Sequence, residues 1–295
     1  MLNAFRRNLP ISISLLAIPL LLYAALLAFA YFGQERLVYF PGIGRDNPAT
    51  PAALGLAYQN LTLKTADGER LHAWFVPHEK PRGTMILSHG NAGSIADRLP
   101  YLPMFRRLGL ATLSFDYRGY GQSTGKPSEE GLTRDAEAAW NYVVAERGVP
   151  ANRIVLFGES LGGAVAAQLA ARLSAQASAS ERPALLVLAS VFTSVPDLGG
   201  ELYRWLPVRW LARIRHDTRA ALAGVTCPVL VAHSPDDDIV PWRHGRALFE
   251  AAPGPKAFLQ LAGGHNEGFV FRRPDWVAFL GAFIDRHLGM MPEDS

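Results

Sequence analysis

The sequence predicts a large α/β domain, over residues 56–289, in which a mostly parallel β-sheet is covered by helices on both faces. Short apolar runs of strand length alternate with helical segments, as in a sheet built with crossover helices. The 295 residues are 49% hydrophobic and 19% charged, which is enough apolar material for a sizeable core. One apolar run, residues 154–157, ends in a Gly-x-Ser-x-Gly pattern at residues 158–162 and is followed by a small-residue helical run.

Eight apolar runs bounded by turn residues are the expected strands: residues 56–63, 71–76, 84–87, 110–115, 154–157, 184–189, 228–232 and 256–261. The first two are expected to form a hairpin around the turn at Asp67-Gly68. Helices are expected at residues 95–108, 129–146, 164–173 and 274–287, the second with acidic residues at its start.

An insertion at residues 191–226 interrupts this alternation. It is too short for a full lid domain, and we expect a minimal cap of one or two helices overhanging the C-terminal edge of the sheet. Its large apolar side chains are Tyr203, Trp205, Trp210 and Leu211. Two interpretations remain for them: they belong to the core, or they line a pocket for an acyl group.

Residues 1–33 are expected to be an N-terminal tail and a transmembrane anchor. The 27 residues from Asn8 to Gln34 contain no Asp, Glu, Lys or Arg, which is long enough for a helix to span a bilayer. Arg6 and Arg7 precede this segment, so the N-terminus is predicted on the cytoplasmic side and the large domain on the extracytoplasmic side. Residues 34–55, rich in Pro and Gly, are the expected linker, and residues 290–295 a tail.

The alternative for this N-terminal segment is a cleaved signal peptide. Ala28-Phe29-Ala30 resembles a cleavage site. The apolar segment is, however, longer than the roughly 7–15 residues of an ordinary signal-peptide core. This length favours an uncleaved single-pass anchor.

Charge and cysteine content narrow the classes of partner. The formal net charge is +3 and the arginines are scattered, so no basic cluster points to a nucleic acid. The single cysteine, Cys227, cannot form an internal disulfide or a Cys-based metal site, and its apolar surroundings predict buried packing. No motif for a metal or an organic cofactor is found, and we expect neither.

The Gly-x-Ser-x-Gly pattern predicts a nucleophile at Ser160. A sharp turn from strand to helix strains the serine backbone, and side chains two residues away on either side would collide. Gly158 and Gly162 remove that collision because they lack a Cβ. The hydroxyl then lies at a helix N-terminus, which favours developing negative charge. The alternative is a glycine-rich turn that carries a solvent-exposed serine.

A serine nucleophile needs a histidine base oriented by a carboxylate, and both candidates lie downstream. His265 follows the last expected strand, and three adjacent aspartates, Asp236, Asp237 and Asp238, follow the strand before it. Both loops leave the C-terminal ends of strands, on the side of Ser160. Each aspartate can reach a histidine, so the residues alone leave the choice among the three open.

An oxyanion formed in acyl transfer needs backbone N–H donors. One is expected from Leu161, directly after the nucleophile. The other is expected from the loop after the third strand, at Asn91, which follows His89 and Gly90. The alternative for this loop is a tight turn with no role beyond sparing backbone clashes.

With these motifs the chain resembles the α/β-hydrolase superfamily, and more closely its membrane-anchored subgroup related to serine depalmitoylases and fungal polarity-associated hydrolases. The resemblance implies the α/β-hydrolase fold and a triad in the order Ser, Asp, His. The family pattern Asp-x-Ile/Val-Val-Pro, applied to residues 237–241, implies Asp237 as the acid, with Asp236 second. The matching segments are residues 37–41, 88–93, 116–121, 158–163 and 264–265.

The expected function is that of a membrane-anchored serine hydrolase, which cleaves carboxylic ester or thioester bonds through an acyl-enzyme without metal or cofactor. A small-molecule or lipid-like ester is the expected substrate. Two alternatives remain: a serine peptidase or acyltransferase that uses the same triad, and a non-catalytic membrane receptor built on the hydrolase fold.

Overall fold

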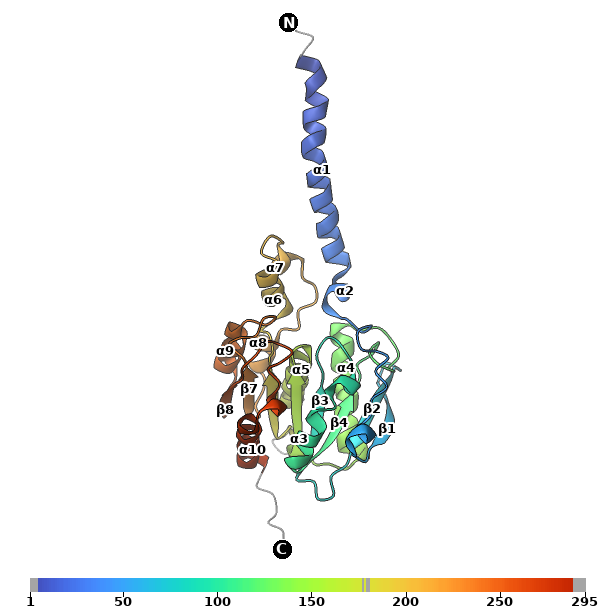
Figure 1. Cartoon of the computed structure of the whole chain (residues 1–295), viewed down its shortest axis with the longest axis vertical. Coiled ribbons are helices and arrows are strands. Elements are labelled where there is room, and N and C mark those ends of the chain that lie inside the picture. The colour runs from blue at the N-terminus through green and yellow to red at the C-terminus, as the bar shows by residue number, and fades with distance from the viewer. Residues whose placement is uncertain (1–4, 177, 179–180, 289–295) are drawn as a thin grey trace.

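An eight-stranded sheet forms the centre of the computed structural model (Figure 1). The structure describes the backbone of residues 5–176, 178 and 181–288, and the side chains of these residues except 5–16 and 176. The strand order is β1-β2-β4-β3-β5-β6-β7-β8; β2 is antiparallel to β1 and β4, and every other pair is parallel. The strands are β1 (Gln59–Lys64), β2 (Arg70–Val76), β3 (Gly83–Ser88), β4 (Leu110–Phe115), β5 (Ile154–Glu159), β6 (Leu185–Ala189), β7 (Val229–His233) and β8 (Lys256–Gln260). The predicted, mostly parallel sheet is confirmed.

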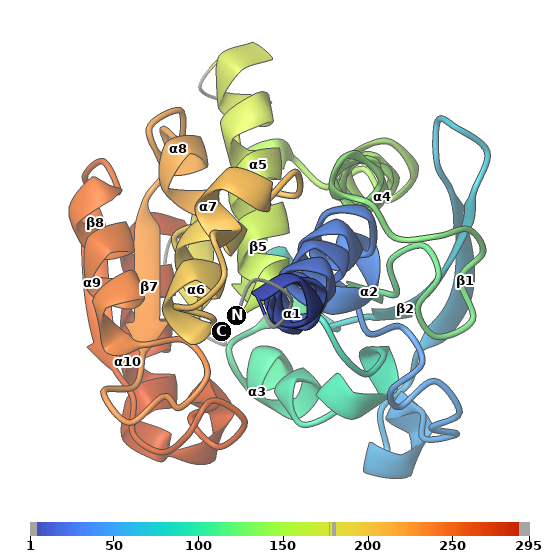
Figure 2. The same cartoon turned by 90° about the horizontal axis from the view of Figure 1, so that it is seen from above.

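Helices cover both faces of this sheet, as Figure 2 shows from above. One face packs against α4, α5, α8 and α9, and the other against α3 and α10. The α-helices are α1 (Phe5–Phe32), α2 (Gln34–Val38), α3 (Tyr101–Arg107), α4 (Glu129–Asn141), α5 (Leu161–Gln176), α6 (Val195–Leu202), α7 (Val208–Leu211), α8 (Thr218–Leu222), α9 (Trp242–Ala251) and α10 (Pro274–Leu288).

The apolar runs form strands because both faces of the sheet are buried. In β5, alternate side chains enter opposite cores: Ile154 and Leu156 on one face, Val155 and Phe157 on the other. A run of four apolar residues therefore contributes side chains to both cores, as is typical of a parallel strand that is buried on both faces. Cys227 is buried as expected, and burial raises the pKa of its thiol to about 12.

Two helical segments differ from expectation. The expected helix at residues 95–108 is divided into a 3-10 turn (Ile95–Arg98) and α3, with Pro100 at the N-cap of α3. Proline lacks the N–H that a continuous helix needs at this position, so a new helix begins after it. The helix α9 was not anticipated; it lies between β7 and β8 and packs on both strands.

The N-terminal helix α1 projects away from the domain (Figure 1). Among the residues described in full, no helix is long and apolar enough to cross a membrane. Residues 1–16 of the expected anchor lie outside that set, as do residues 290–295 of the expected tail. After α1, the short helix α2 leads into the residues that join the domain.

The insertion at residues 191–226 forms the expected small cap, with α6 and α7 above the sheet and α8 packed on α5. Of the two interpretations of its large apolar side chains, membership of the core is wrong for the three aromatic ones. Tyr203 and Trp205 are exposed, and Trp210 is 91% exposed. Leu211 is half-buried.

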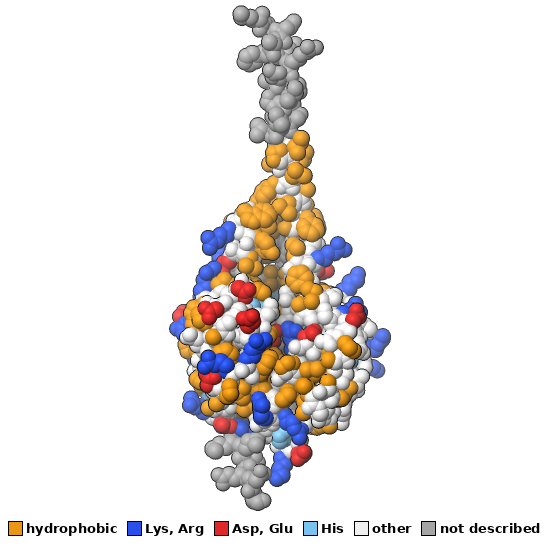
Figure 3. Space-filling model, in the orientation of Figure 1, with side chains coloured by type: hydrophobic (Ala, Val, Ile, Leu, Met, Phe, Trp, Pro, Cys, Tyr) orange, Lys and Arg blue, Asp and Glu red, His pale blue; other side chains and the backbone are white. Residues whose placement is uncertain are grey.

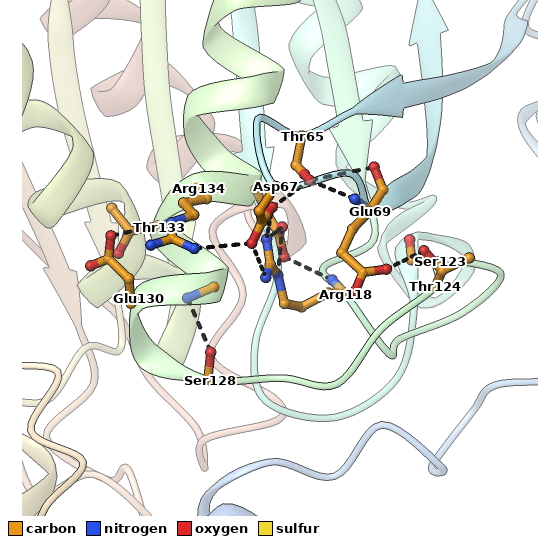
Figure 4. A network of polar contacts seen from close by, with 12 residues as sticks. Thr65, Asp67, Glu69, Arg118, Ser123, Thr124, Ser128, Glu130, Thr133 and Arg134 are labelled. Carbon is orange, nitrogen blue, oxygen red and sulfur yellow. Dashed lines mark hydrogen bonds and ion pairs between the residues drawn. The ribbon is translucent and has the colours of Figure 1, made fainter.

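A charged network ties the β1–β2 hairpin to the rest of the domain. Arg118, after β4, binds Asp67 of the hairpin turn through Nη1 at 2.8 Å and Asp135 of α4 through Nε at 2.9 Å (Figure 4). Arg134 of α4 also binds Asp67. The hydrogen bond from Arg118 is the main reason that the pKa of Asp67 lies well below its usual value. The arginine therefore links three elements that are distant in sequence.

The turn from β5 to α5 brings backbone segments unusually close together. A Cβ on Gly162 would lie 2.1 Å from the carbonyl oxygen of Ser88, and one on Gly158 would lie 2.3 Å from the carbonyl oxygen of Gly162. Both distances are below the 3.0 Å that real Cβ atoms respect. The helix α5 can start against the end of β3 only with glycine at these positions.

We therefore expect Gly162→Ala to lower the free energy of unfolding by about 3 kcal/mol, because the backbone of β3 or α5 must move to admit the methyl group. Urea denaturation measures this loss. The control is Gly42→Ala, whose Cβ would meet no atom within 4 Å. Equal stability of the two variants would contradict the close packing at this turn.

Candidate active site

Ser160 lies in the turn between β5 and α5 with a φ of 51°, in the left-handed region. A non-glycine residue there is strained and is held by its surroundings. Its N–H donates to the carbonyl oxygen of Ala189, the last residue of β6, at 2.9 Å, and its own carbonyl oxygen accepts from Gly163 at 3.0 Å. Hydrogen bonds on both sides therefore maintain the strained backbone that presents the hydroxyl.

The parallel strands bring the other predicted site residues to the same edge of the sheet. Ser160 follows β5, Asp237 follows β7, and His265 follows β8. These strands are joined through β6 by continuous parallel pairing, so their carboxyl ends lie side by side. Residues 105 positions apart in the sequence thus share one edge, which is where ligands bind in open α/β sheets.

Asp237 and His265 are in direct contact. His265 Nδ1 lies 2.9 Å from Oδ2 and 3.0 Å from Oδ1 of the carboxylate. The backbone N–H groups of Val240 and Ile239 donate to Asp237 Oδ1 at 2.8 and 3.1 Å. Burial acts to raise the pKa of Asp237, but the hydrogen bonds from His265 and the two N–H groups outweigh it, so its pKa is lowered. The carboxylate is therefore ionised, buried and bonded to the imidazole.

The three adjacent aspartates have different surroundings. Asp237 binds the His265 ring, whereas Asp238 Oδ1 accepts the backbone N–H of His265 at 2.8 Å. Asp236 is exposed, and its own N–H donates to Ser234 Oγ. Asp238 therefore holds the histidine loop, and Asp237 alone of the three orients the imidazole.

The buried histidine His233 supports the loop that carries Asp237. It is fully buried at the end of β7, with Nε2 2.8 Å from the carbonyl oxygen of Val240 and 3.5 Å from Asp237 Oδ2. Burial lowers the pKa of His233, so the ring is neutral and donates from Nε2. This bond holds the turn whose N–H groups bind the Asp237 carboxylate.

The expected oxyanion turn packs directly against Ser160. A Cβ on Gly90 would lie 3.7 Å from Ser160 Cβ, and a Cβ on Gly162 would lie 2.4 Å from the carbonyl oxygen of His89. Leu161 is the first residue of α5, so its N–H has no acceptor within the helix. Asn91, two residues after His89, is held through its carbonyl oxygen, which accepts from the Tyr120 hydroxyl at 3.0 Å.

The N-terminal segment also binds this turn, which the sequence alone did not indicate. The N–H of Phe40 donates to the carbonyl oxygen of Asn91 at 3.1 Å, and Asn91 Nδ2 donates to the carbonyl oxygen of Val38 at 3.2 Å. Tyr39 between them is buried, and its hydroxyl lies 2.8 Å from His216 Nε2 in the cap insertion. Residues 38–40 are thus hydrogen-bonded both to the expected oxyanion turn and to the cap insertion.

A buried ion pair at the residue before Ser160 was not predicted from the sequence. Arg98 Nη2 binds Glu159 Oε1 at 2.8 Å, and the Tyr101 hydroxyl donates to Glu159 Oε2 at 3.2 Å. Glu159 precedes Ser160 and is buried. No local pattern connects Arg98 with a residue 61 positions later, so only the packing of the segment after β3 reveals the pair.

The serine–histidine bond of a working triad is not formed in this structure. Among the described residues, Ser160 Oγ has no hydrogen-bond partner. Catalytic hydrogen bonds are often long or absent before substrate binds. Two surface hollows of about 440 Å³ lie elsewhere and are not lined by Ser160, Asp237 or His265. No described group of three or more His, Cys, Asp or Glu residues is arranged to hold a metal ion.

Comparison with known proteins identifies the family to which the chain belongs. Residues 79–219 match the family model described as serine aminopeptidase, S33. The chain is 36% identical over 248 residues to the α/β hydrolase domain-containing protein WAV2 of Arabidopsis thaliana, covering 78% of this chain and 77% of the relative. It is 33% identical over 225 residues to protein bem46 of Schizosaccharomyces pombe, covering 73% of each.

A solved structure shares the fold. An esterase of Pyrococcus furiosus superposes with a TM-score of 0.67 at 19% identity, covering 81% of this chain and 94% of the esterase. The strained turn at Ser160, the Asp237–His265 hydrogen bond at the same sheet edge, and these relatives all agree. The chain belongs to the α/β-hydrolase superfamily, in the subgroup of bem46, and is an enzyme of the serine-hydrolase type.

Proposed function

We propose that this protein cleaves carboxylic ester or thioester bonds through a serine acyl-enzyme. The hydrogen bond between Asp237 and His265, at the sheet edge where Ser160 occupies its strained turn, carries the proposal. Ser160 Oγ attacks the acyl carbon while His265 Nε2 takes its proton. Asp237 fixes Nδ1 as the protonated nitrogen and stabilises the imidazolium that forms. This step requires Ser160 Oγ and His265 Nε2 to come within hydrogen-bond distance of each other.

The negative charge that develops on the acyl oxygen must be stabilised by hydrogen-bond donors close to Ser160. The N–H of Leu161, at the start of α5, and the N–H of Asn91 are the proposed pair. His265 then protonates the leaving alcohol or thiol, and a water activated by His265 releases the acid. No metal or cofactor takes part in these proposed steps.

Replacing the nucleophile tests the reaction. We expect Ser160→Ala to lower the turnover of p-nitrophenyl acetate by roughly six orders of magnitude, because the remaining groups cannot form an acyl-enzyme. A fluorophosphonate probe is expected to label the wild type at Ser160 and to leave the variant unlabelled. Full hydrolysis by the folded variant would refute the assignment, and an unlabelled, inactive but folded wild type would favour the non-catalytic receptor.

The adjacent aspartates supply matched variants for the acid. We expect Asp237→Asn to lower kcat roughly 10⁴-fold, since an amide cannot hold the imidazole in the required tautomer. Asp236→Asn makes the same chemical change one residue away, at a carboxylate that does not touch His265, and is expected to leave kcat within about threefold. Steady-state kinetics measure both, and equal losses would show that Asp237 is not the acid.

A peptidase is the second candidate, because the matching family model is that of a serine aminopeptidase. The same triad attacks amides, whose leaving nitrogen must be protonated. An acyltransferase would differ only in the nucleophile that resolves the acyl-enzyme. Aminoacyl p-nitroanilides compared with p-nitrophenyl esters of matched acyl length separate the candidates. Faster release from the anilides would favour the peptidase.

We also propose that residues 1–33 anchor the protein in a membrane, with the N-terminus cytoplasmic and the hydrolase domain extracytoplasmic. The uncharged stretch from Asn8 to Gln34, preceded by Arg6 and Arg7, supports this. Intact-mass measurement of the protein from a membrane fraction is expected to give the uncleaved chain, resistant to carbonate extraction. Loss of about thirty residues would instead indicate a signal peptide.

A further inference from the structure

The cap exposes apolar side chains over a short stretch that we call the cap tip, residues 202–215. Tyr203, Trp205 and Trp210 are exposed there, and Trp210 is almost fully so. Leu202 is also exposed. Single exposed apolar residues are ordinary, but two tryptophans, a tyrosine and a leucine within nine residues form a cluster that marks a contact surface. Figure 3 shows hydrophobic side chains gathered at this end of the molecule.

The charges of the cap tip have one sign. Residues 202–215 contain four arginines and no Asp or Glu. All four, Arg204, Arg209, Arg213 and Arg215, are exposed. Arg209 has one acidic neighbour from outside the tip, Asp197 at 3.4 Å. Tryptophan and arginine together, without acids, suit the interface of an anionic bilayer, where aromatic rings lie among headgroups and cations meet lipid phosphates.

The cap tip is bound to the N-terminal helix. The Tyr23 hydroxyl donates to the carbonyl oxygen of Trp205 at 3.2 Å. The buried Gln34 donates through Nε2 to the carbonyl oxygen of Leu211 at 2.7 Å, and its Oε1 accepts the N–H of Arg213 at 2.7 Å. These three hydrogen bonds therefore fix the cap tip to the C-terminal half of α1 and to Gln34 directly after it.

The described part of α1 continues the same apolar surface. Its exposed side chains include Leu20, Leu21, Leu22, Phe29 and Phe32, of which Phe32 is 75% exposed. Figures 1 and 2 show α7 beside this helix, at the end of the domain from which α1 projects. A membrane that buries these α1 side chains must therefore also come close to the cap tip.

We propose that the cap tip, together with the end of α1, lies in the headgroup region of an anionic lipid bilayer. A second copy of the chain is a poorer occupant, because two tips would bring eight arginines together without an acid from either tip. The tip lies in the interface plane rather than across the bilayer, since α6 and α7 are only eight and four residues long.

This placement defines a substrate class, an inference that rests on the proposed function. The cap insertion begins beside the turn that carries Ser160. A Cβ on Gly163, three residues after Ser160, would lie 2.1 Å from Cγ2 of Val191, the first residue of the insertion. The carboxyl edge that carries Ser160 therefore lies on the membrane side of the domain. The substrate is an ester whose acyl chain is dissolved in the bilayer, and it reaches Ser160 beside the cap without crossing bulk water.

Bromine-labelled lipids test the contact without requiring activity. The full chain is placed in phosphatidylcholine–phosphatidylglycerol vesicles with or without bromine on the acyl chains near the headgroup, and tryptophan emission is compared. We expect bromine to lower the emission of the wild type by up to the share of two of its six tryptophans. The variant with Trp205→Phe and Trp210→Phe should lose this quenching, because Trp74, Trp140 and Trp276 are buried and Trp242 lies on α9 outside the tip.

Equal emission of the wild type with and without bromine would overturn the proposal. Quenching that persists in the double variant would also overturn it. A dimer that Trp210→Glu dissociates, while bromine has no effect, would overturn it as well, because that result indicates a contact between proteins. These outcomes do not depend on catalysis, so they remain distinct from a failure of the proposed ester cleavage, which p-nitrophenyl acetate reports.

A kinetic comparison tests the substrate class. We expect Trp205→Glu with Trp210→Glu to lower kcat/KM roughly tenfold for an ester dissolved in vesicles, because buried aromatic area is lost from the interface. The same variant should hydrolyse water-soluble p-nitrophenyl acetate at the wild-type rate. Phe279→Glu is the control, since Phe279 is an exposed aromatic side chain on α10, away from the cap. Equal losses on both substrates would contradict delivery from the bilayer.

Discussion

The contact on which the site depends is the close approach of the start of α5 to the end of β3. Gly162 packs against the carbonyl oxygens of Ser88 and His89 at a distance that excludes any side chain. This approach forces the chain to reverse within one residue after β5, and Ser160 takes the left-handed conformation that results. The same contact brings the turn after β3, which includes Asn91, against Ser160 and the start of α5. One steric constraint therefore sets the position of both the proposed nucleophile and the turn expected to supply an oxyanion donor.

The charged groups around this turn are buried, and each has a partner. Glu159 is bound by Arg98 and Tyr101, and Asp237 by His265 and two backbone N–H groups. A buried carboxylate without partners would take up a proton rather than stay ionised. The hydrogen bonds that keep Asp237 ionised are therefore a condition for its role with His265, and Asp238 and His233 act by holding the two loops that supply them.

The segment between α1 and the domain is bound to the domain at several points rather than being a free connection. Residues 38–40 bind the backbone and side chain of Asn91, and Gln34 binds the cap. The N-terminal helix, the cap and the proposed oxyanion turn are thus mechanically linked. The proposed lipid contact at the cap tip would involve the same set of linked segments.

Much of the fold followed from the sequence, because parallel strands buried on both faces require continuous apolar runs, and such runs are visible without knowledge of their partners. The runs at residues 110–115 and 154–157 predicted β4 and most of β5. The nucleophile turn was visible for the same reason: a local steric need places glycines at fixed positions around Ser160. Pro100 was misjudged because apolar spacing continues through it, although its missing N–H starts a new helix there.

What the sequence by itself determined was the order of the elements, the identity of Ser160 and His265 as candidates, and the short list of three aspartates. Tertiary structure decided the rest: that Asp237 meets the imidazole while Asp238 holds its loop, that Arg98 binds Glu159 next to Ser160, and that Trp205 and Trp210 are exposed. Local patterns record backbone sterics and burial along one element. Contacts between loops, and the exposure of a cap, depend on which surfaces the packed sheet brings together.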